Sequence, residues 1–337
     1  MSAGIWRPAY RMLATRGRTR RLLVFIFHRV LATPDPLLPY EPDVQQFDWM
    51  MRLVSENFSV LHLEEAVYRL ARDDLPPAAA CLTFDDGYRD NVELALPILR
   101  RYGLVGTFFV ATAFLGNGRM WNDDIVEAVR RLGSGRAEWG GFGLGSHALT
   151  TAADRLRCLN TVLPTLKYYP HRERERLARA IARQSGVTDQ LTLMMAPEHI
   201  NTLVASGMEI GAHSHTHPIL SQLTVEEVRD ELARGRAELE RITGRAVRVL
   251  AYPNGDTRRD LSVRDADLIR DMGFVCAVTT DWGVADRATN PFLMPRFTPW
   301  DRTPTRFALR CAWALAGQMS PQRKSGRSVA EGIWTQT

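Results

Sequence analysis

The sequence is poor in cysteine, with four residues in 337, and none of them forms a CxxC or another closely spaced pair. This pattern argues against a disulfide framework and against a zinc site built from cysteines. Two of the four lie in apolar, strand-like runs, so we expect reduced thiols in the protein core. The four are Cys81, Cys158, Cys276 and Cys311.

Long apolar segments are also lacking. The apolar run at 22–27 is too short to cross a bilayer. The Arg-rich segment before it has neither the apolar core nor the small-residue cleavage site of a secretory signal peptide. We therefore expect a cytoplasmic protein, with the inner face of the membrane as an option.

The motifs of nucleotide and nucleic-acid binding are missing as well. No glycine-rich phosphate loop, RNA-binding motif or zinc-finger spacing occurs, so we expect no nucleic-acid partner. The net charge of +5 is diffuse except for an arginine cluster before the first apolar run, which can attract anionic lipid and leaves peripheral membrane contact open. Its members are Arg7, Arg11, Arg16, Arg18, Arg20 and Arg21.

Short apolar runs and helix-like segments alternate along the chain. Strand-like runs end at 27, 86, 112, 212, 251 and 278, and such strand–helix repeats predict a parallel sheet. We expect an α/β fold, a distorted TIM-like (β/α) barrel over residues 21–315. A basic segment at 1–20 precedes it, a helical insertion at about 120–200 covers its mouth, and a polar, disordered tail follows at 316–337.

Two adjacent acids close one of these runs. The segment 79–84 is followed by Asp85, Asp86 and Gly87. Two neighbouring carboxylates are costly to desolvate unless a cation or hydrogen bonds compensate, which indicates a metal nearby. One acid would bind the metal and the other would take a proton from water as general base. The alternative is a solvated turn.

Imidazoles close a second run. Residues 207–212 lead into His213, Ser214, His215, Thr216 and His217. Positions 213 and 217 are one helical turn apart, which lets two rings point at one ion. Two histidines and one carboxylate leave coordination positions for water and substrate, as a catalytic zinc site requires. The alternative is a surface or capping histidine cluster.

TFDDGY at 83–88 and HSHTH at 213–217 resemble the first two motifs of the polysaccharide deacetylases with a NodB homology domain, carbohydrate esterase family 4. The resemblance implies a metal-dependent hydrolase with Asp85 as general base and with Asp86, His213 and His217 as metal ligands. His215 falls in a variable place. The implied cofactor is a divalent ion, with zinc expected and cobalt, nickel or manganese as alternatives.

A third family motif is matched by AYPNGD at 251–256. The resemblance makes the backbone N–H of Asn254 a donor to the oxyanion. Asp281-Trp282 resembles the end of a fourth motif, but Val278 stands where the family has an acid. Arg296, at an expected strand end, is expected to pair with Asp85 or to bind substrate, with a purely structural salt bridge as the alternative.

The general acid must come from an unusual place. Most relatives supply a histidine after the second motif, but no histidine follows His217. We expect His28, after the run at 22–27, to replace it, because the first and last strands of a closed barrel are neighbours. This order resembles the circularly permuted poly-N-acetylglucosamine deacetylases. The alternative is a buried histidine bonded to backbone.

Aromatic residues near the motifs are candidates for sugar binding: Tyr88, Trp121, Tyr252 and Trp282. Trp121 opens the insertion and could stack on a sugar while Asn122 or Asp123 bonds hydroxyls, or it could anchor the insertion. A predicted helix at 304–314 with Arg302, Arg306 and Arg310 could lie on a membrane, although packing on the barrel is commoner.

The sequence thus predicts hydrolysis of N-acetyl groups on amino sugars of a cell-envelope polysaccharide or lipid-linked glycan precursor. Two alternatives stay open. One is a deformylase or another amidase on the same scaffold, and the other is a catalytically silent glycan-binding protein. The sequence specifies neither the glycan nor the oligomeric state.

Overall fold

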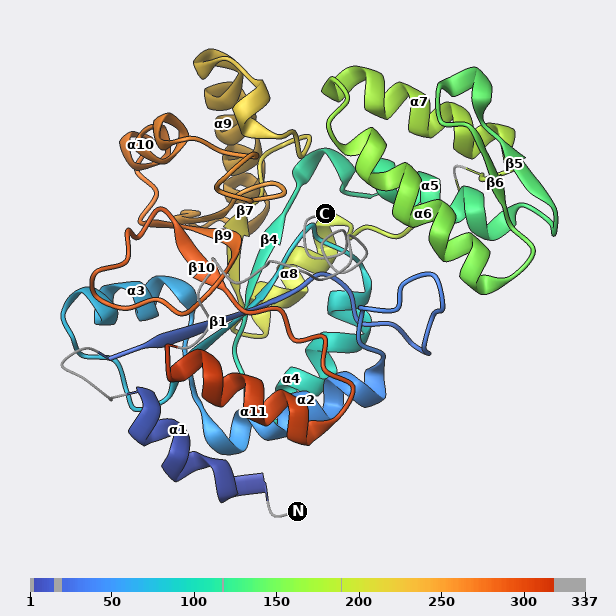
Figure 1. Ribbon diagram of the computed structural model, residues 1–337. Helices are drawn as coiled ribbons and strands as arrows, with labels where there is room; N and C mark the ends of the chain where they lie inside the picture. The colour runs from blue at the N-terminus through green and yellow to red at the C-terminus, as the bar shows by residue number, and fades with distance from the viewer. Residues whose placement is uncertain (1–2, 15–19, 117, 189, 318–337) are drawn as a thin grey trace.

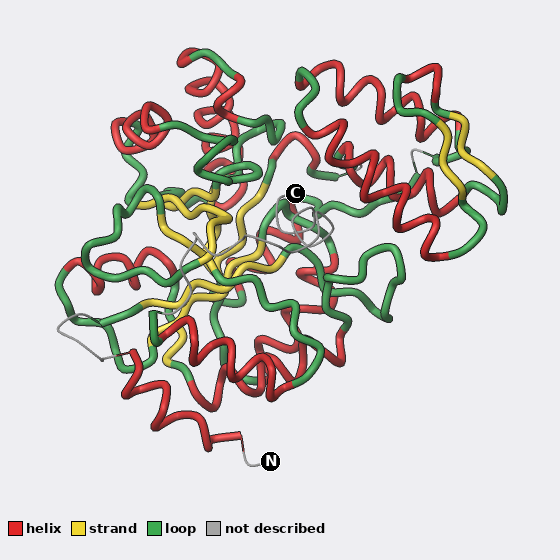
Figure 2. The backbone as a smooth tube through the Cα atoms, viewed as in Figure 1, coloured by secondary structure: helices red, strands yellow, loops and turns green. Residues whose placement is uncertain are grey.

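A parallel sheet closes almost completely into a barrel, with a separate helical lobe beside it (Figures 1 and 2). The computed structural model describes residues 3–14, 20–116, 118–188 and 190–317. The predicted tail beyond 317, together with Arg16 and Arg18, lies outside the described residues. The barrel strands are β1 (Leu22–Phe27), β2 (Ser59–Val60), β3 (Ala79–Phe84), β4 (Thr107–Val110), β7 (Glu209–Ala212), β8 (Val249–Ala251), β9 (Cys276–Trp282) and β10 (Met294–Arg296).

The strand order is β1-β3-β4-β7-β8-β9-β10, and all these pairs are parallel. The ends of the sheet meet where Phe297 bridges to Phe25, with Phe297 N donating to Val24 O (2.7 Å) and Ile26 N donating to Phe297 O (3.0 Å). The first and last strands are therefore neighbours, as the barrel prediction requires.

Helices cover the outside of the sheet. Local signals set both ends of α9, which starts at a reciprocal Thr224–Glu227 capping box and ends at Gly244, whose φ is 64°. The barrel helices are α1 (Arg7–Ala14), α2 (Val44–Asn57), α3 (Leu63–Ala71), α4 (Leu96–Arg101), α8 (Pro197–Ala205), α9 (Val225–Thr243), α10 (Val263–Asp271) and α11 (Pro304–Leu315). Before α4, residues Asn91–Ala95 form a π-helical turn, so the regular α-helix starts at Leu96, next to Pro97.

Successive residues of the strands face two different clusters. Leu22 and Val24 of β1 pack inside the barrel with Cys81 and Cys276, whereas Leu23 and Phe25 pack against the surrounding helices. Both faces are apolar, which explains why these strands read as continuous hydrophobic runs. All four cysteines are free and buried, as predicted.

The insertion forms its own small core. It consists of α5 (Trp121–Arg131), a hairpin of β5 (Arg136–Glu138) and β6 (Ser146–Ala148), α6 (Ala152–Lys167) and α7 (His171–Gln184). The hairpin was not expected from the glycine-rich sequence. Buried residues of the three helices pack together and against Leu37 and Leu38 of the loop after β1. Figure 1 shows this lobe beside the barrel.

None of the helices in the described residues combines the length and the hydrophobicity that a membrane span requires.

Candidate metal centre and active site

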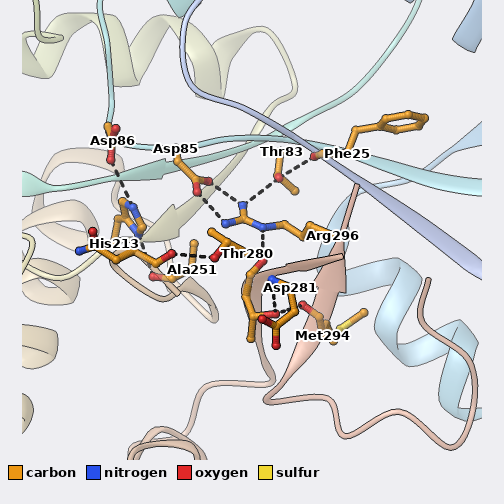
Figure 3. Close-up of polar contacts among 12 residues, drawn as sticks. Phe25, Thr83, Asp85, Asp86, His213, Ala251, Thr280, Asp281, Met294 and Arg296 are labelled. Carbon is orange, nitrogen blue, oxygen red and sulfur yellow. Dashed lines mark hydrogen bonds and ion pairs between the residues drawn. The ribbon is translucent and has the colours of Figure 1, made fainter. Parts of the chain in front are cut away.

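Three buried side chains direct one ligand atom each toward a common point. Asp86 follows β3, and His213 and His217 follow β7. Nε2 of His213 and Nε2 of His217 lie 3.3 and 3.4 Å from Asp86 Oδ1, and the two nitrogens are 3.2 Å apart. Ligand atoms about 2.0–2.1 Å from a tetrahedral zinc are about 3.3 Å apart, so this triangle fits a metal ion. Figure 3 shows the contact between Asp86 and His213.

The surroundings of these three groups also fit a cation. His213 Nδ1 donates to the carbonyl of Ala251 (2.8 Å), which leaves the Nε2 lone pair for a metal. Apart from its contacts with the two imidazole nitrogens, the buried Asp86 Oδ1 has no hydrogen-bond partner among the described residues. A buried carboxylate oxygen without a donor is costly, and a divalent ion would remove that cost.

The pKa values of the two imidazoles are shifted in opposite directions. Burial alone lowers the pKa of His213, but the contact with Asp86 and the charge of Asp85 outweigh burial and raise it. Burial and the neighbouring His213 hold the pKa of His217 well below its ordinary value. His217 is therefore neutral at pH 7, the form in which a histidine binds metal.

Backbone strain gathers in the motifs. Asp86, Ser214, His217 and Asn254 have φ of 74°, 60°, 56° and 63°, and only two other non-glycine residues of the described chain have positive φ. Such conformations cost about 1–3 kcal/mol each and persist where the surroundings impose them.

The spacing of His213 and His217 in the sequence predicts one helical turn. The backbone between them is instead an irregular loop, with Ser214 Oγ accepting from the N–H of His217 (3.1 Å).

Helix α9 supports this loop through two residues that sequence reasoning missed. Glu231 accepts from the N–H groups of His215 (3.0 Å) and Thr216 (2.7 Å) and from Thr216 Oγ1 (2.8 Å). A Cβ on Gly235 would lie 2.6 Å from the carbonyl oxygen of Ser214, so only glycine allows this approach. A glycine inside a strongly predicted helix was the one available signal.

His215 turns away from the other two histidines. Its Nδ1 lies 2.9 Å from Thr112 Oγ1, and its Nε2 lies 3.1 Å from a guanidinium nitrogen of Arg234 on α9. It is absent from the group of possible ligands found among the described residues. This placement agrees with the variable position that the motif comparison gave it.

Asp85 is held by a buried arginine. Arg296, at the end of β10, donates to Asp85 Oδ1 (2.8 Å) and Oδ2 (2.7 Å) and to Thr83 Oγ1 (3.1 Å), as Figure 3 shows. It also donates to Thr279 O (2.7 Å). Burial by itself raises the pKa of Asp85, but the charge and hydrogen bonds of Arg296 outweigh burial and lower it. Asp85 is therefore an oriented carboxylate at neutral pH.

His28 lies beside these acids because of the strand register. Phe27 of β1 is opposite Phe84 of β3, and the N–H of Asp85 donates to Phe27 O (2.9 Å). His28 is buried, and its Nε2 has no hydrogen-bond partner among the described residues. It lines a pocket together with Asp86 and with residues of the insertion helix α5.

The other side of the pocket comes from the insertion. Asn122 and Asp123 of α5 line it, opposite Tyr88. The hydroxyl of Tyr88 donates to Asp123 Oδ1 (3.0 Å), and Arg29 lies over the Tyr88 ring at 4.8 Å. Burial raises the pKa of Asp123 to about 7. The insertion thus contributes a wall of the same pocket as Asp86, a candidate metal ligand.

The remaining aromatic candidates have different surroundings. Trp121 is buried in the core of the insertion under the guanidinium of Arg174, at 5.0 Å. Tyr252 is buried, and its hydroxyl donates to Phe292 O (2.8 Å). Trp282 is half-buried and packs against Trp300 in a tilted arrangement, with 4.1 Å between ring centroids and 38° between the ring planes. Of the four, Tyr88 lines the pocket.

Asn254 lies on the loop after β8 that the third motif predicted. Its carbonyl accepts from Thr280 Oγ1 (2.8 Å), which fixes the strained peptide. The side-chain Nδ2 is buried and has no partner among the described residues. Like the acids and histidines, it follows the carboxyl end of a parallel strand, where sites of this fold class occur.

A larger cavity lies at the other end of the barrel, where β7 and β8 begin. His62, Glu209, Arg245 and Arg248 contribute to its lining. Glu209 already accepts from Thr107 Oγ1 (2.6 Å) and from the N–H of Leu63 (3.0 Å), so it anchors the start of α3. This cavity contains none of the motif residues.

The architecture is that of the NodB-type deacetylases. The deacetylase PplD of Streptococcus pyogenes, solved in complex with acetate, covers 87% of this chain and 99% of its own, with a TM-score of 0.59 and 16% identity. IcaB from Ammonifex degensii covers 88% and 97%, with a TM-score of 0.55 and 22% identity. At these identities, the likeness shows the fold.

Sequence comparison identifies the family. The polysaccharide deacetylase family model matches residues 72–276, more than half of the chain, and the chain belongs to this family of amide-bond hydrolases. YxkH of Bacillus subtilis (strain 168), which is named as a polysaccharide deacetylase, is 29% identical to this chain over 115 residues. That match spans 34% of this chain and 40% of YxkH. His28 and Arg296 both lie outside the part that the family model matches.

Proposed function

We propose that this protein is a metal-dependent hydrolase that removes N-acetyl groups from amino sugars of a glycan. The observation that carries the proposal is the convergence of Asp86, His213 and His217 beside an ionised Asp85. Family membership supports a deacetylase. A closed four-residue site would be structural, but three protein ligands leave room for water and substrate.

Asp86, His213 and His217 would hold the ion, which when bound lowers the pKa of a water molecule and polarises the acetyl carbonyl. Zinc fits the nitrogen-rich ligand set, and cobalt, nickel or manganese could replace it. Asp85 takes the proton of the attacking water. Its hydrogen bonds to Arg296 fix the carboxylate and keep it ionised before the proton arrives.

The departing amine and the developing oxyanion need separate partners. The backbone N–H of Asn254 donates to the acetyl oxygen as negative charge grows on it. His28, which lines the pocket beside Asp86, donates a proton to the nitrogen as the C–N bond breaks. Without that proton the leaving group would be an amine anion, which is far too basic to depart.

The family and the pocket support a proposal for the substrate class. Members of the family deacetylate polysaccharides, and we propose a glycan or lipid-linked amino sugar here. Asn122, Asp123 and Tyr88 supply polar groups that could bond sugar hydroxyls beside the reacting acetamide. Acetate, the product of such a reaction, is bound in the PplD structure.

The decisive experiment measures acetate release from chitooligosaccharides, poly-N-acetylglucosamine and lipid-linked acetylated sugars. The reaction should stop after chelation and resume when zinc or cobalt is added. Release of formate from N-formyl analogues, without acetate, would instead establish a deformylase. Metal content and glycan binding without any acyl release would establish a binding protein and reject the proposal.

A further inference from the structure

The N-terminal and C-terminal helices pack side by side although they are far apart in the sequence. Figure 1 shows α1 next to α11 on one side of the barrel. The buried hydroxyl of Tyr10 on α1 donates to the carbonyl of Ala308 on α11 (2.9 Å), and Phe307 packs against Trp49 of α2. The two helices are therefore firmly attached to the body, and their outer faces belong to one region of the surface.

That region collects exposed apolar side chains. Among the described residues, seven large hydrophobic side chains are exposed, and four of them belong to this region. They are Ile5 (68%), on the 3-10 turn Ala3–Trp6 that leads into α1, Met12 (65%) on α1, and Leu309 (44%) and Trp313 (60%) on α11. The other three lie on separate elements. Leu309 and Trp313 are four positions apart on α11, so they share one face of that helix.

The charges around these side chains have one sign. Arg7 and Arg11 of α1 and Arg302 and Arg306 at the start of α11 are exposed, and neither helix contains an acidic residue. In the sequence, residues 1–21 contain six arginines and no acid, while the stretch 22–301 has a net charge of −6. Positive charge is thus segregated from the acidic body.

We propose that the outer faces of α1 and α11 dock on an anionic lipid surface. Exposed Leu, Ile, Met and Trp side chains insert between headgroups, and the arginines pair with lipid phosphates and carboxylates. A tryptophan suits the membrane interface because its ring is apolar and its N–H is polar. A second protein copy would meet like charges on the same face, which disfavours a self-associated dimer.

The test is co-sedimentation of the full chain with two kinds of vesicle. One kind is phosphatidylcholine alone, and the other also contains about 30 mol% phosphatidylserine or phosphatidylglycerol, which gives it the negative surface charge of an anionic membrane leaflet. We expect binding to the anionic vesicles that weakens as salt rises. Arg7→Gln with Arg306→Gln should lower the partition coefficient about 25-fold, since each arginine contributes roughly fivefold. Arg172→Gln with Arg183→Gln on α7 is the charge-matched control.

A second pair of variants tests the apolar contribution. Leu309→Ser with Trp313→Ser should abolish most of the binding, and Val263→Ser, an exposed residue on α10, should leave it intact. Melting temperature and metal content should match wild type, because the changed side chains are exposed. Equal binding to neutral and anionic vesicles, or a concentration-dependent dimer that the Leu309/Trp313 variant alone disrupts, would overturn the proposal.

Discussion

Arg296 and Asp85 form a buried, two-pronged ion pair across the barrel, with N···O distances of 2.8 and 2.7 Å between residues 211 positions apart. The pair joins the last strand to the end of β3 and fixes the carboxylate beside the proposed metal ligands. It also fixes the charge of Asp85, because the arginine lowers the pKa of that carboxyl against the effect of burial.

Arg296→Met should move the acid limb of the pH–rate profile to higher pH. Without the guanidinium, burial raises the pKa of Asp85, so the base is protonated at pH values where the wild type is active. The wild-type pair stabilises the fold above the ordinary carboxyl pKa, and this stability is lost as pH falls through the lowered folded value. The variant should lose about 3–5 kcal/mol of stability.

The control for Arg296→Met is Lys167→Met, which breaks the buried Lys167–Asp260 pair (3.2 Å) outside the site. It should cost stability without moving the acid limb. Acid limbs that coincide in wild type and Arg296→Met, with metal content equal at each pH, would contradict the role assigned to Arg296.

Asp85→Asn and Asp86→Asn should separate two functions in adjacent residues. Asp85→Asn should keep the metal and lose turnover by about 10²–10⁴-fold, the usual contribution of a general base. Asp86→Asn should lose the metal itself. Bound metal measured by mass spectrometry, next to acetate release, checks both. Loss of metal in Asp85→Asn would show that it is a ligand.

His28→Gln should greatly slow amide hydrolysis but spare hydrolysis of an activated aryl acetate. The phenolate of such an ester departs without a proton, whereas the sugar amine requires one. The expected loss on the amide is about 10²–10⁴-fold. His62→Gln, at the other end of the barrel, is the control. Equal losses on amide and ester would mean that His28 acts by holding the pocket together.

Metal removal should destabilise the fold. An ion at 100 times its Kd stabilises the folded state by about 2.7 kcal/mol, so chelation should lower Tm by several degrees and zinc should restore it. His217→Gln should eliminate this response, and His215→Gln should preserve it, because His215 faces Thr112 and Arg234. If chelation removes the metal but leaves the Tm unchanged, the proposed metal site would be contradicted.

Gly235→Ala tests how α9 supports the histidine loop. In an open helix this change stabilises by up to about 1 kcal/mol. Here the new Cβ would meet the carbonyl of Ser214 at 2.6 Å, so we expect lower stability and weaker metal binding. Calorimetry and zinc titration measure both, with the surface change Ala233→Ser on the same helix as control. A stabilised variant with wild-type affinity would show that the loop can shift freely.

Local patterns in the sequence predicted much of the fold. Apolar runs identified most of the parallel strands because both faces of each are buried, and Thr224 with Gly244 set the two ends of α9. The sequence missed the β5–β6 hairpin, whose short strands are mostly exposed. It also took the loop from 213 to 217 for a helical turn, because spacing alone does not reveal left-handed residues.

The residue types of the site came from the sequence, and their relations came from the tertiary structure. Asp85, Asp86, His213 and His217 were identifiable because each motif follows a strand, and parallel strands end at one face. Only the closed barrel places Arg296 against Asp85 and His28 beside both acids. Strand pairing between distant segments decides those contacts, and no local pattern encodes which strands close the ring.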